Sequence, residues 1–197
     1  MTIVFDIDDT LSETDGYSKE YIAKFFLEHN LPYKQVTDIA RFAERYFDWD
    51  KDTALNWYKQ YGDEMMLNFP PKPNAVAVIN SLFEAGHKII LATARATDWH
   101  VDPEGITTKW LEINKIKYHK LYVGRIDKEQ ICLTEQADIF VDDDIKLCAK
   151  VQEHCKNTLP LLISTKYNLT LETPENIKRI YNLKEILNYI NINTKIN

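Results

Sequence analysis

The stretch Thr2-Ile3-Val4-Phe5-Asp6-Ile7-Asp8-Asp9-Thr10-Leu11 joins a short apolar run to a group of acidic residues. Ile3 to Phe5 reads as a buried strand, and Asp6 and Asp8 follow it two positions apart. In extended backbone, side chains at positions i and i+2 point to the same side. The pattern therefore predicts a strand end with paired negative charge, which a divalent cation would neutralise and which can supply a nucleophile.

Further apolar runs along the chain have the length and composition of buried parallel strands. They are Lys88 to Ala92, a weaker run at Lys120 to Val123, Ile139 to Val141, and Leu159 to Ile163. Helical patterns separate them at Pro73 to Glu84, Thr107 to Asn114 and Asp144 to Glu153. This alternation predicts an α/β fold, a Rossmann-like parallel sheet with helices on both faces. Apolar residues at helical spacing from Glu175 to Ile190 predict a final helix.

The segment between the first strand and the rest of the sheet differs from the remainder of the chain. It has no clear strand and is rich in aromatic residues at mostly helical spacing: Tyr21, Phe25, Phe26, Phe42, Tyr46, Phe47, Trp49, Trp57, Tyr58 and Tyr61. Pro70-Pro71 ends it. We predict a core made of residues 1–14 and 71–197 and a small helical cap made of residues 15–70. Packing inside the cap explains these aromatics more simply than stacking on a nucleobase does.

Composition narrows the classes of partner and compartment. The net charge of −6 argues against a nucleic-acid polymer held through its phosphates. Three cysteines, Cys132, Cys148 and Cys155, are an odd number without a CxxC pair, which favours a reducing compartment over a disulfide framework. The chain shows neither a signal segment nor an apolar run of membrane-spanning length, so we expect a cytoplasmic protein without a membrane partner.

Polar residues with complementary chemistry follow several of the predicted strands. Besides Asp6 and Asp8, these are Thr93, then Lys128 at the start of a helix, then Asp142-Asp143-Asp144. Ligands of open parallel sheets bind outside the carboxyl ends of the strands, where these residues would meet. A carboxylate nucleophile, a second carboxylate for proton transfer, and a hydroxyl and an ammonium for phosphate oxygens suit phosphoryl transfer. The oxygen-rich set also suits Mg²⁺.

These residues resemble the signature motifs of the haloacid dehalogenase (HAD) superfamily, in the family's order. The motifs are Asp6-Ile7-Asp8-Asp9-Thr10, Thr93, Lys128 and Asp142-Asp143, and the resemblance covers roughly residues 1–12 and 72–165. It implies that Asp6 is the nucleophile and that Asp8 is the general acid/base and also a metal ligand through its backbone carbonyl. It implies metal binding by Asp6 and Asp143 as well, with Asp142 in or near the metal site. The family also places a helical cap after its first motif.

Within the family, Ala92-Thr93-Ala94-Arg95 and the spacing of Lys128 are similar to the 5'(3')-deoxyribonucleotidase-like branch. We therefore place Thr93, Lys128, Ala94 and Arg95 among the phosphate-binding residues. For Arg95, pairing with an acidic side chain is an equal alternative. Lys115, Lys117 and Lys120 are the alternative lysines. Asp144 fits equally well as a helix cap.

The resulting expectation is a Mg²⁺-dependent phosphomonoesterase that uses an aspartyl-phosphate intermediate, acting on nucleoside or deoxynucleoside monophosphates. Phosphatases of sugar phosphates or other small metabolites are an alternative, as is a phosphotransferase, since the intermediate is common to both. A receiver-like signalling module also combines acidic residues, a Thr, a Lys and Mg²⁺. It would need an acceptor Asp on a strand before Thr93, where this sequence is helical and aromatic.

Overall fold

The computed structural model describes residues 1–41 and 43–193 and has a six-stranded sheet at its centre. Its strands are β1 (Thr2–Phe5), β2 (Lys88–Thr93), β3 (Lys120–Val123), β4 (Ile139–Asp142), β5 (Leu159–Ile163) and β6 (Lys178–Ile180). The spatial order is β3-β2-β1-β4-β5-β6, and every neighbouring pair is parallel. All the strands expected from the sequence are present, and β1 lies in the middle of the sheet.

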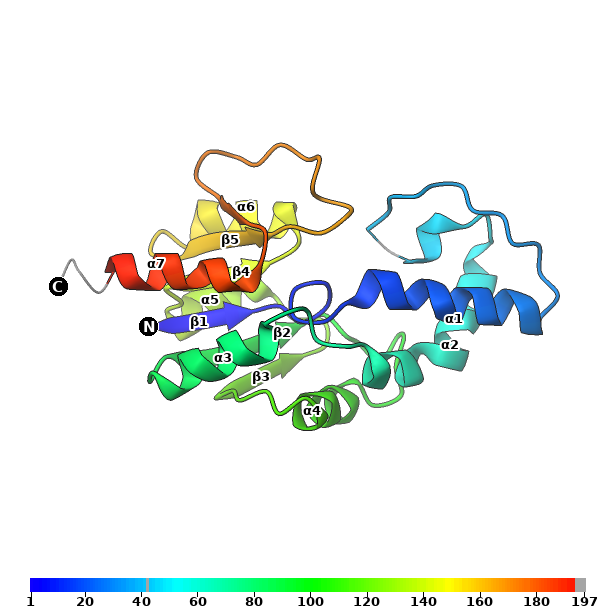
Figure 1. Cartoon of the computed structure of the whole chain (residues 1–197), viewed down its shortest axis with the longest axis horizontal. Helices are drawn as coiled ribbons and strands as arrows, with labels where there is room; N and C mark the ends of the chain where they lie inside the picture. Colours follow the sequence, from blue (N-terminus) through cyan, green and yellow to red (C-terminus); the bar gives the residue numbers. More distant parts are fainter. Residues whose placement is uncertain (42, 194–197) are drawn as a thin grey trace.

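Helices cover both faces of the sheet because alternate strand residues point in opposite directions. Ile3 and Phe5 lie in an apolar cluster with α3 (Ala75–Glu84), α4 (Pro103–Ile113) and α7 (Ile186–Asn193). Val4 lies in the opposite cluster with α5 (Lys128–Glu135) and α6 (Ile145–His154). Figure 1 shows the helices on the two sides of the strands. The predicted α/β fold class is confirmed.

The helix α4 begins four residues before its predicted start at Thr107. Asp102 caps it by accepting a hydrogen bond from the Gly105 N–H at 2.9 Å, and Pro103 occupies the first turn. Both are ordinary signals of a helix start. The apolar pattern alone does not detect this first turn, because Ile106 is its one large aliphatic residue.

The predicted continuous helix from Glu175 to Ile190 is wrong. The segment instead contains the edge strand β6, a short 3₁₀ turn at Leu183–Glu185, and only then α7. Asn182 separates strand from helix, because its side chain accepts a hydrogen bond from the Lys184 N–H at 3.1 Å. Ile177 and Ile180 belong to the clusters on opposite faces of the sheet. Their helical spacing therefore reflects burial in two different cores, which a one-dimensional pattern cannot distinguish.

The segment after β1 forms α1 (Thr14–Glu28), a 3₁₀ turn at Ala43–Tyr46, and α2 (Lys51–Asn68), which project from the sheet as a separate layer (Figure 1). It has its own aromatic cluster, in which Trp57 and Tyr46 are completely buried. Phe42 lies outside the described residues. Two hydrogen bonds join the entering and leaving chains, Glu13 N–H to Pro70 O at 2.9 Å and Lys72 N–H to Leu11 O at 2.7 Å. The chain therefore enters and leaves the cap segment side by side.

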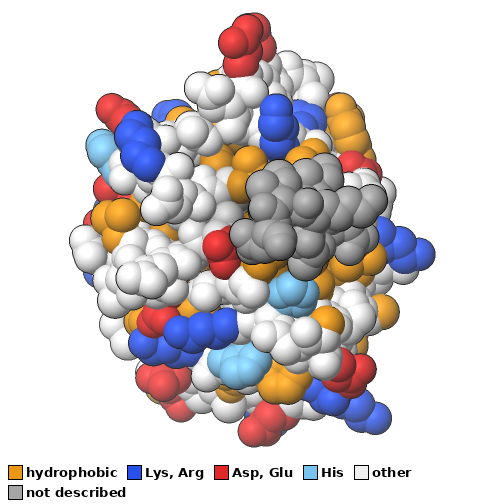
Figure 2. Space-filling view, turned by 90° about the vertical axis from the view of Figure 1, so that its left-hand side faces the viewer, with side chains coloured by type: hydrophobic (Ala, Val, Ile, Leu, Met, Phe, Trp, Pro, Cys, Tyr) orange, Lys and Arg blue, Asp and Glu red, His pale blue; other side chains and the backbone are white. Residues whose placement is uncertain are grey.

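The end of the molecule remote from the cap has acidic, basic and histidine side chains interspersed (Figure 2). Across residues 1–41 and 43–193, no helix has the length and apolar character needed to cross a membrane.

At the open edge of the sheet, Glu135 accepts hydrogen bonds from Lys88 at 2.8 Å, Lys120 at 2.5 Å and the Tyr122 hydroxyl. Its side chain is 6% exposed, although the two lysines are about half exposed. The hydrogen bond from Lys120, followed by those from Lys88 and Tyr122, lowers the pKa of Glu135 to about 2. Because the folded pKa lies below the unfolded one, this stabilisation is present above the unfolded pKa and is lost as the pH falls.

We expect Glu135→Gln to lower the free energy of unfolding by about 1 kcal/mol at neutral pH, after allowance for solvent screening of the lysines. The difference from wild type should shrink between about pH 5 and pH 2, measured by denaturant unfolding across that range. Glu84→Gln is the matched control, because Glu84 makes a surface pair with Lys117 at 2.9 Å. An equal loss in both variants, or a loss independent of pH, would contradict the assignment.

Candidate active site

A tight turn after β1 points the acidic residues into the carboxyl end of the sheet. The Asp6 N–H donates to the carbonyl of Val141 at 2.9 Å, which extends the β1–β4 pairing by one residue. The carbonyl of Ile7 then accepts from the N–H groups of Thr10, Leu11 and Ser12 at 2.7–3.3 Å. This register places Asp6 beside Asp142 at the end of β4.

Three buried carboxylates meet at this point. Ligand atoms of Asp6, Asp142 and Asp143 all lie within 4.8 Å of one another. Lys128 joins them, with its Nζ 2.5 Å from Asp6 Oδ1 and 2.8 Å from Asp142 Oδ2. Its side chain is 8% exposed. Residues from two neighbouring strands and one helix are thus brought together across 122 positions of sequence between Asp6 and Lys128.

Local structure explains why Lys128 is the lysine that reaches the cluster. Gly124, with φ +113°, turns the chain after β3, a conformation that favours glycine. Asp127 then caps α5 by accepting from the Glu129 and Gln130 N–H groups at 3.1 and 3.2 Å. Lys128 is the first residue of α5. Two alternative lysines are engaged elsewhere, Lys117 with Glu84 and Lys120 with Glu135.

The charge balance of the cluster fits a divalent cation. Burial raises the pKa of Asp6 well above its usual value, with Asp142 and Asp143 adding to the effect and Lys128 opposing it. Burial, reinforced by the charges of Asp142 and Asp9, raises the pKa of Asp143 to about 8. Three carboxylates share one ammonium, so a bound cation would remove the excess negative charge. The donors are all oxygen, which Mg²⁺ prefers.

The backbone carbonyl of Asp143 is held by two residues that sequence reasoning did not identify. The Tyr167 hydroxyl donates to it at 2.5 Å and Asn168 Nδ2 donates at 2.9 Å. Asn168 is completely buried and also donates to the carbonyl of Ile163 at 2.9 Å. These contacts fix the turn after β4. Nothing in the local sequence around Tyr167 predicts them, since they depend on how the loop after β5 folds back.

Asp144 has the capping role that the sequence allowed. It is the residue before α6, and its side chain accepts from the Lys146 N–H at 2.9 Å. Its other oxygen pairs with Arg41 of the cap segment at 2.7 Å. Asp144 therefore both begins a helix and connects the core to the cap.

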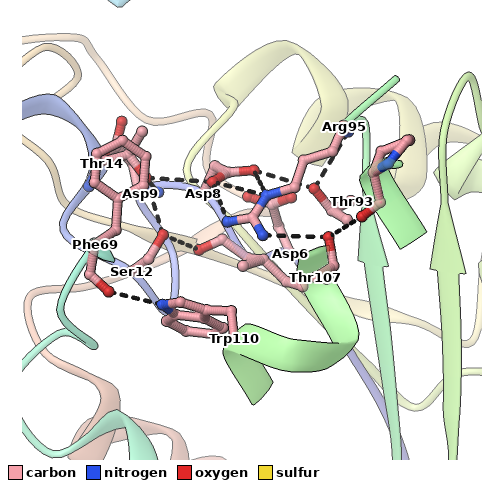
Figure 3. A network of polar contacts seen from close by, with 12 residues as sticks. Asp6, Asp8, Asp9, Ser12, Thr14, Phe69, Thr93, Arg95, Thr107 and Trp110 are labelled. Atoms are coloured by element: carbon pink, nitrogen blue, oxygen red, sulfur yellow. Dashed lines mark hydrogen bonds and ion pairs between the residues drawn. The ribbon is translucent and has the colours of Figure 1, made fainter. Parts of the chain in front are cut away.

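Asp8 lies in a different set of contacts, drawn in Figure 3. Arg95 donates to both of its oxygens, from Nη2 to Oδ1 at 2.8 Å and from Nε to Oδ2 at 3.0 Å. The Thr93 hydroxyl donates at 3.1 Å and the Thr14 hydroxyl at 3.3 Å. Burial would raise the pKa of Asp8, but the charge and hydrogen bonds of Arg95, with Thr93, hold it below its usual value. Of the two roles open for Arg95, the structure shows pairing with an acid.

Asp9 ties the first motif to the cap. Its Oδ1 accepts from the Thr14 N–H at 3.1 Å and the Asp15 N–H at 2.9 Å, at the start of α1 (Figure 3). Its backbone has φ +55°, a conformation that Asp tolerates better than most residues. Burial raises the pKa of Asp9 to about 7. In the sequence, the contact of Asp9 with α1 is indicated only by its place in the acidic run after β1.

A cleft of about 810 Å³ lies over these groups, between core and cap. The core contributes Asp6, Asp8, Lys128 and the exposed Ala94. The cap contributes Arg41 and Arg45, which the sequence did not single out, and Tyr58, one of the aromatic residues expected in the cap. Trp99 is 42% exposed, and its ring lies 5.2 Å from that of Tyr58. The cleft thus combines an anion-binding floor with a partly aromatic wall.

Comparison with known proteins identifies the fold. No protein-family model matches the sequence, and no curated protein matches it. Among solved structures, a haloacid dehalogenase-like family hydrolase from Streptococcus pneumoniae aligns over 96% of this chain and 97% of its own, with 14% identity and a TM-score of 0.66. A predicted phosphoglycolate phosphatase from Haemophilus somnus aligns over the same shares, with 15% identity and a TM-score of 0.67.

A third similar structure is CbbY from Rhodobacter sphaeroides, solved as a mutant in complex with xylulose-1,5-bisphosphate. It has 12% identity and a TM-score of 0.62, and the alignment covers 93% of this chain and 95% of that one. At such identities the likeness establishes a shared fold. The chain therefore has a HAD-like fold over nearly its whole length, including the helical segment after β1.

Proposed function

We propose that this protein is a Mg²⁺-dependent phosphomonoesterase of the HAD type that forms an aspartyl-phosphate on Asp6. The observation that carries the proposal is the joint placement of Asp6, Lys128, Asp142 and Asp143 at the floor of a cleft, with Asp8 beside them. The HAD-like fold supports it, because these residues lie at the carboxyl ends of strands or at a helix start beside them, where ligands of open parallel sheets bind.

In the proposed reaction, a carboxylate oxygen of Asp6 attacks phosphorus while the bond to the leaving oxygen breaks. Asp8, which is ionised in the free protein because Arg95 lowers its pKa, takes up a proton when substrate binds and gives it to that leaving oxygen. Asp8 then takes a proton from water, which attacks the aspartyl-phosphate, releases phosphate and regenerates the carboxylate of Asp6. Asp8 is protonated again at the end of the cycle. Lys128 and Thr93, with the backbone at Ala94, stabilise the charge that accumulates on the phosphoryl oxygens.

The metal ligands in this proposal are the carboxylates of Asp6 and Asp143, the backbone carbonyl of Asp8, and Asp142 in or near the site. When bound, Mg²⁺ supplies positive charge next to the phosphoryl oxygens and reduces repulsion between the phosphate and the carboxylates.

For the substrate, we propose a nucleoside or deoxynucleoside monophosphate. The aromatic pair of Tyr58 and Trp99 at the cleft wall supports a planar leaving group, since bases stack on such rings. Trp57, Tyr46 and Tyr61, by contrast, are buried and serve the interior of the cap.

A phosphorylated sugar or other small metabolite is the second candidate. Two arginines of the cap segment, Arg41 and Arg45, line the cleft and suit a second anionic group. Two of the similar structures are a predicted phosphoglycolate phosphatase and a complex with xylulose-1,5-bisphosphate, and both compounds are small phosphorylated metabolites. Transfer of the phosphoryl group to an alcohol rather than to water would use the same intermediate.

A receiver-like module fits less well. It would need an additional strand carrying an acceptor Asp between β1 and β2, and the described residues between these two strands form helices and turns.

The test is release of inorganic phosphate from a panel of phosphomonoesters, with Mg²⁺ and with chelator. The panel contains ribo- and deoxyribonucleoside monophosphates, sugar phosphates, phosphoglycolate and 4-nitrophenyl phosphate. We expect Mg²⁺-dependent release that favours deoxynucleotides. Preference for sugar phosphates or phosphoglycolate would keep the mechanism and replace the substrate class. Absence of release from every compound, or release unaffected by chelator, would contradict the proposed function.

A further inference from the structure

The guanidinium of Arg95 is held by hydrogen bonds to neighbouring protein groups. Its side chain is 2% exposed, although the residue borders the cleft. Its Nη1 donates to the Thr107 hydroxyl at 3.2 Å, and that hydroxyl donates to the carbonyl of Pro103 at 2.6 Å. Nε and Nη2 are both engaged by Asp8. Each of its three nitrogens thus has a protein partner.

The surface beneath the guanidinium is also fixed. Its central carbon lies 5.9 Å from the centre of the Trp110 ring, and that ring is fully buried. The indole Nε1–H donates to the carbonyl of Phe69 at 2.7 Å (Figure 3). To reach a phosphate, Arg95 would have to leave a partly buried ion pair with Asp8 and a buried hydrogen bond with Thr107, which is energetically costly.

The same contacts determine where Asp8 points. Both of its oxygens accept from the planar fork of Arg95, and Thr93 and Thr14 add further donors. Among the residues the structure describes, the close carboxylate cluster consists of Asp6, Asp142 and Asp143, and Asp8 is not part of it. A bidentate guanidinium–carboxylate pair has defined geometry, which a single ammonium would not provide.

We propose that Arg95 is a positioning residue that acts on the reaction through Asp8, rather than a ligand of the substrate phosphate. It holds the Asp8 carboxylate apart from the metal cluster and oriented for proton transfer with the leaving oxygen and with water. The inference rests on the proposed function, because it assigns Asp8 the proton-transfer role. Of the two roles that the sequence left open for Arg95, it favours pairing with an acidic side chain over contact with the phosphate.

The test is a double-mutant cycle between Arg95→Met and Asp8→Asn, measured as kcat/KM. For an alkyl phosphate we expect Arg95→Met alone to lower kcat/KM by about 10- to 100-fold, part of the usual contribution of general acid–base catalysis. All four proteins of the cycle are assayed with the same alkyl phosphate, with enzyme in excess so that the slow Asp8→Asn reaction can be measured. In the Asp8→Asn background we expect Arg95→Met to cause about a twofold further loss at most, since the two residues act as one unit.

Inhibition by inorganic phosphate separates the two roles of Arg95. A positioning role leaves the inhibition constant within about threefold of wild type, whereas loss of a charged phosphate ligand raises it by about tenfold or more. Losses that multiply in the double mutant, or a weakened phosphate inhibition, would overturn the inference while leaving the phosphatase proposal intact. An inactive wild-type protein would overturn the phosphatase proposal first.

Arg125→Met is the matched control. Arg125 also binds an aspartate through Nε and Nη2, Asp98 at 2.9 and 2.7 Å, but its side chain is 79% exposed and lies outside the cleft lining. The Arg125→Met variant should retain wild-type kcat/KM.

If Arg95→Met does not fold, the variants Arg95→Lys and Thr107→Val replace it. Both should reduce kcat/KM for the alkyl phosphate with unchanged phosphate inhibition, and the opposite pattern would overturn the inference.

Discussion

We expect Asp6→Asn to abolish turnover while leaving the fold intact. An amide oxygen is a poor nucleophile toward phosphorus, so kcat should fall by about 10⁴-fold or more, as for other removed nucleophiles. The substitution keeps the shape of the side chain and removes one of three crowded negative charges. Lys128 retains its contact with Asp142 at 2.8 Å. The melting temperature should therefore stay close to that of wild type.

The measurement is phosphate release under single-turnover and steady-state conditions, together with thermal unfolding. Asp50→Asn provides the matched control, because Asp50 caps α2 by accepting from the Thr53 N–H at 2.7 Å and takes no part in the cleft. Asn caps helices as well as Asp does, so this variant should be fully active. Near-normal activity of Asp6→Asn would show that another group attacks phosphorus.

The fold was predictable from the sequence because each central strand is buried on both faces. Such strands are continuous apolar runs, and four of the six are of this kind, including Ile3 to Phe5 and Ile139 to Val141. The edge strands are less regular: β3 is only half-buried along most of its length, and β6 has three residues, two of them charged. An edge strand of that length has no pattern of its own and forms because β5 offers it a partner.

The same distinction holds for the candidate site. Residues at strand ends or helix starts, such as Asp6, Asp143 and Lys128, were predictable, since topology brings those positions together. Tyr167 and Asn168 were not, because their contacts with the Asp143 carbonyl depend on the path of a loop. Arg41 and Arg45 reach the cleft through the placement of the cap over the core, which also lies beyond any local pattern.

Lys128→Met should have the largest effect on stability, because one ammonium serves two buried carboxylates. Burial alone would lower the pKa of Lys128, but the charges of Asp142 and Asp6 raise it above its usual value. Removing one partner of a buried ion pair costs about 3–5 kcal/mol, since the remaining charge stays desolvated. For a chain of this size that corresponds to a fall of about 10 °C in melting temperature.

The variant should also respond to Mg²⁺ more strongly than wild type. With Lys128 absent, the negative charges of Asp6, Asp142 and Asp143 are less well neutralised, so added Mg²⁺ should raise the melting temperature by more than it does in wild type.

Lys150→Met is the control, because Lys150 borders the same cleft but is exposed, and its loss should change stability by about 0.5 kcal/mol or less. Thermal unfolding of the three proteins, with chelator and across a Mg²⁺ titration, decides the matter. Equal melting temperatures of Lys128→Met and wild type in chelator would mean that Lys128 does not balance the buried charge. A lower melting temperature of Lys128→Met that added Mg²⁺ does not raise would mean that the carboxylate cluster does not bind Mg²⁺.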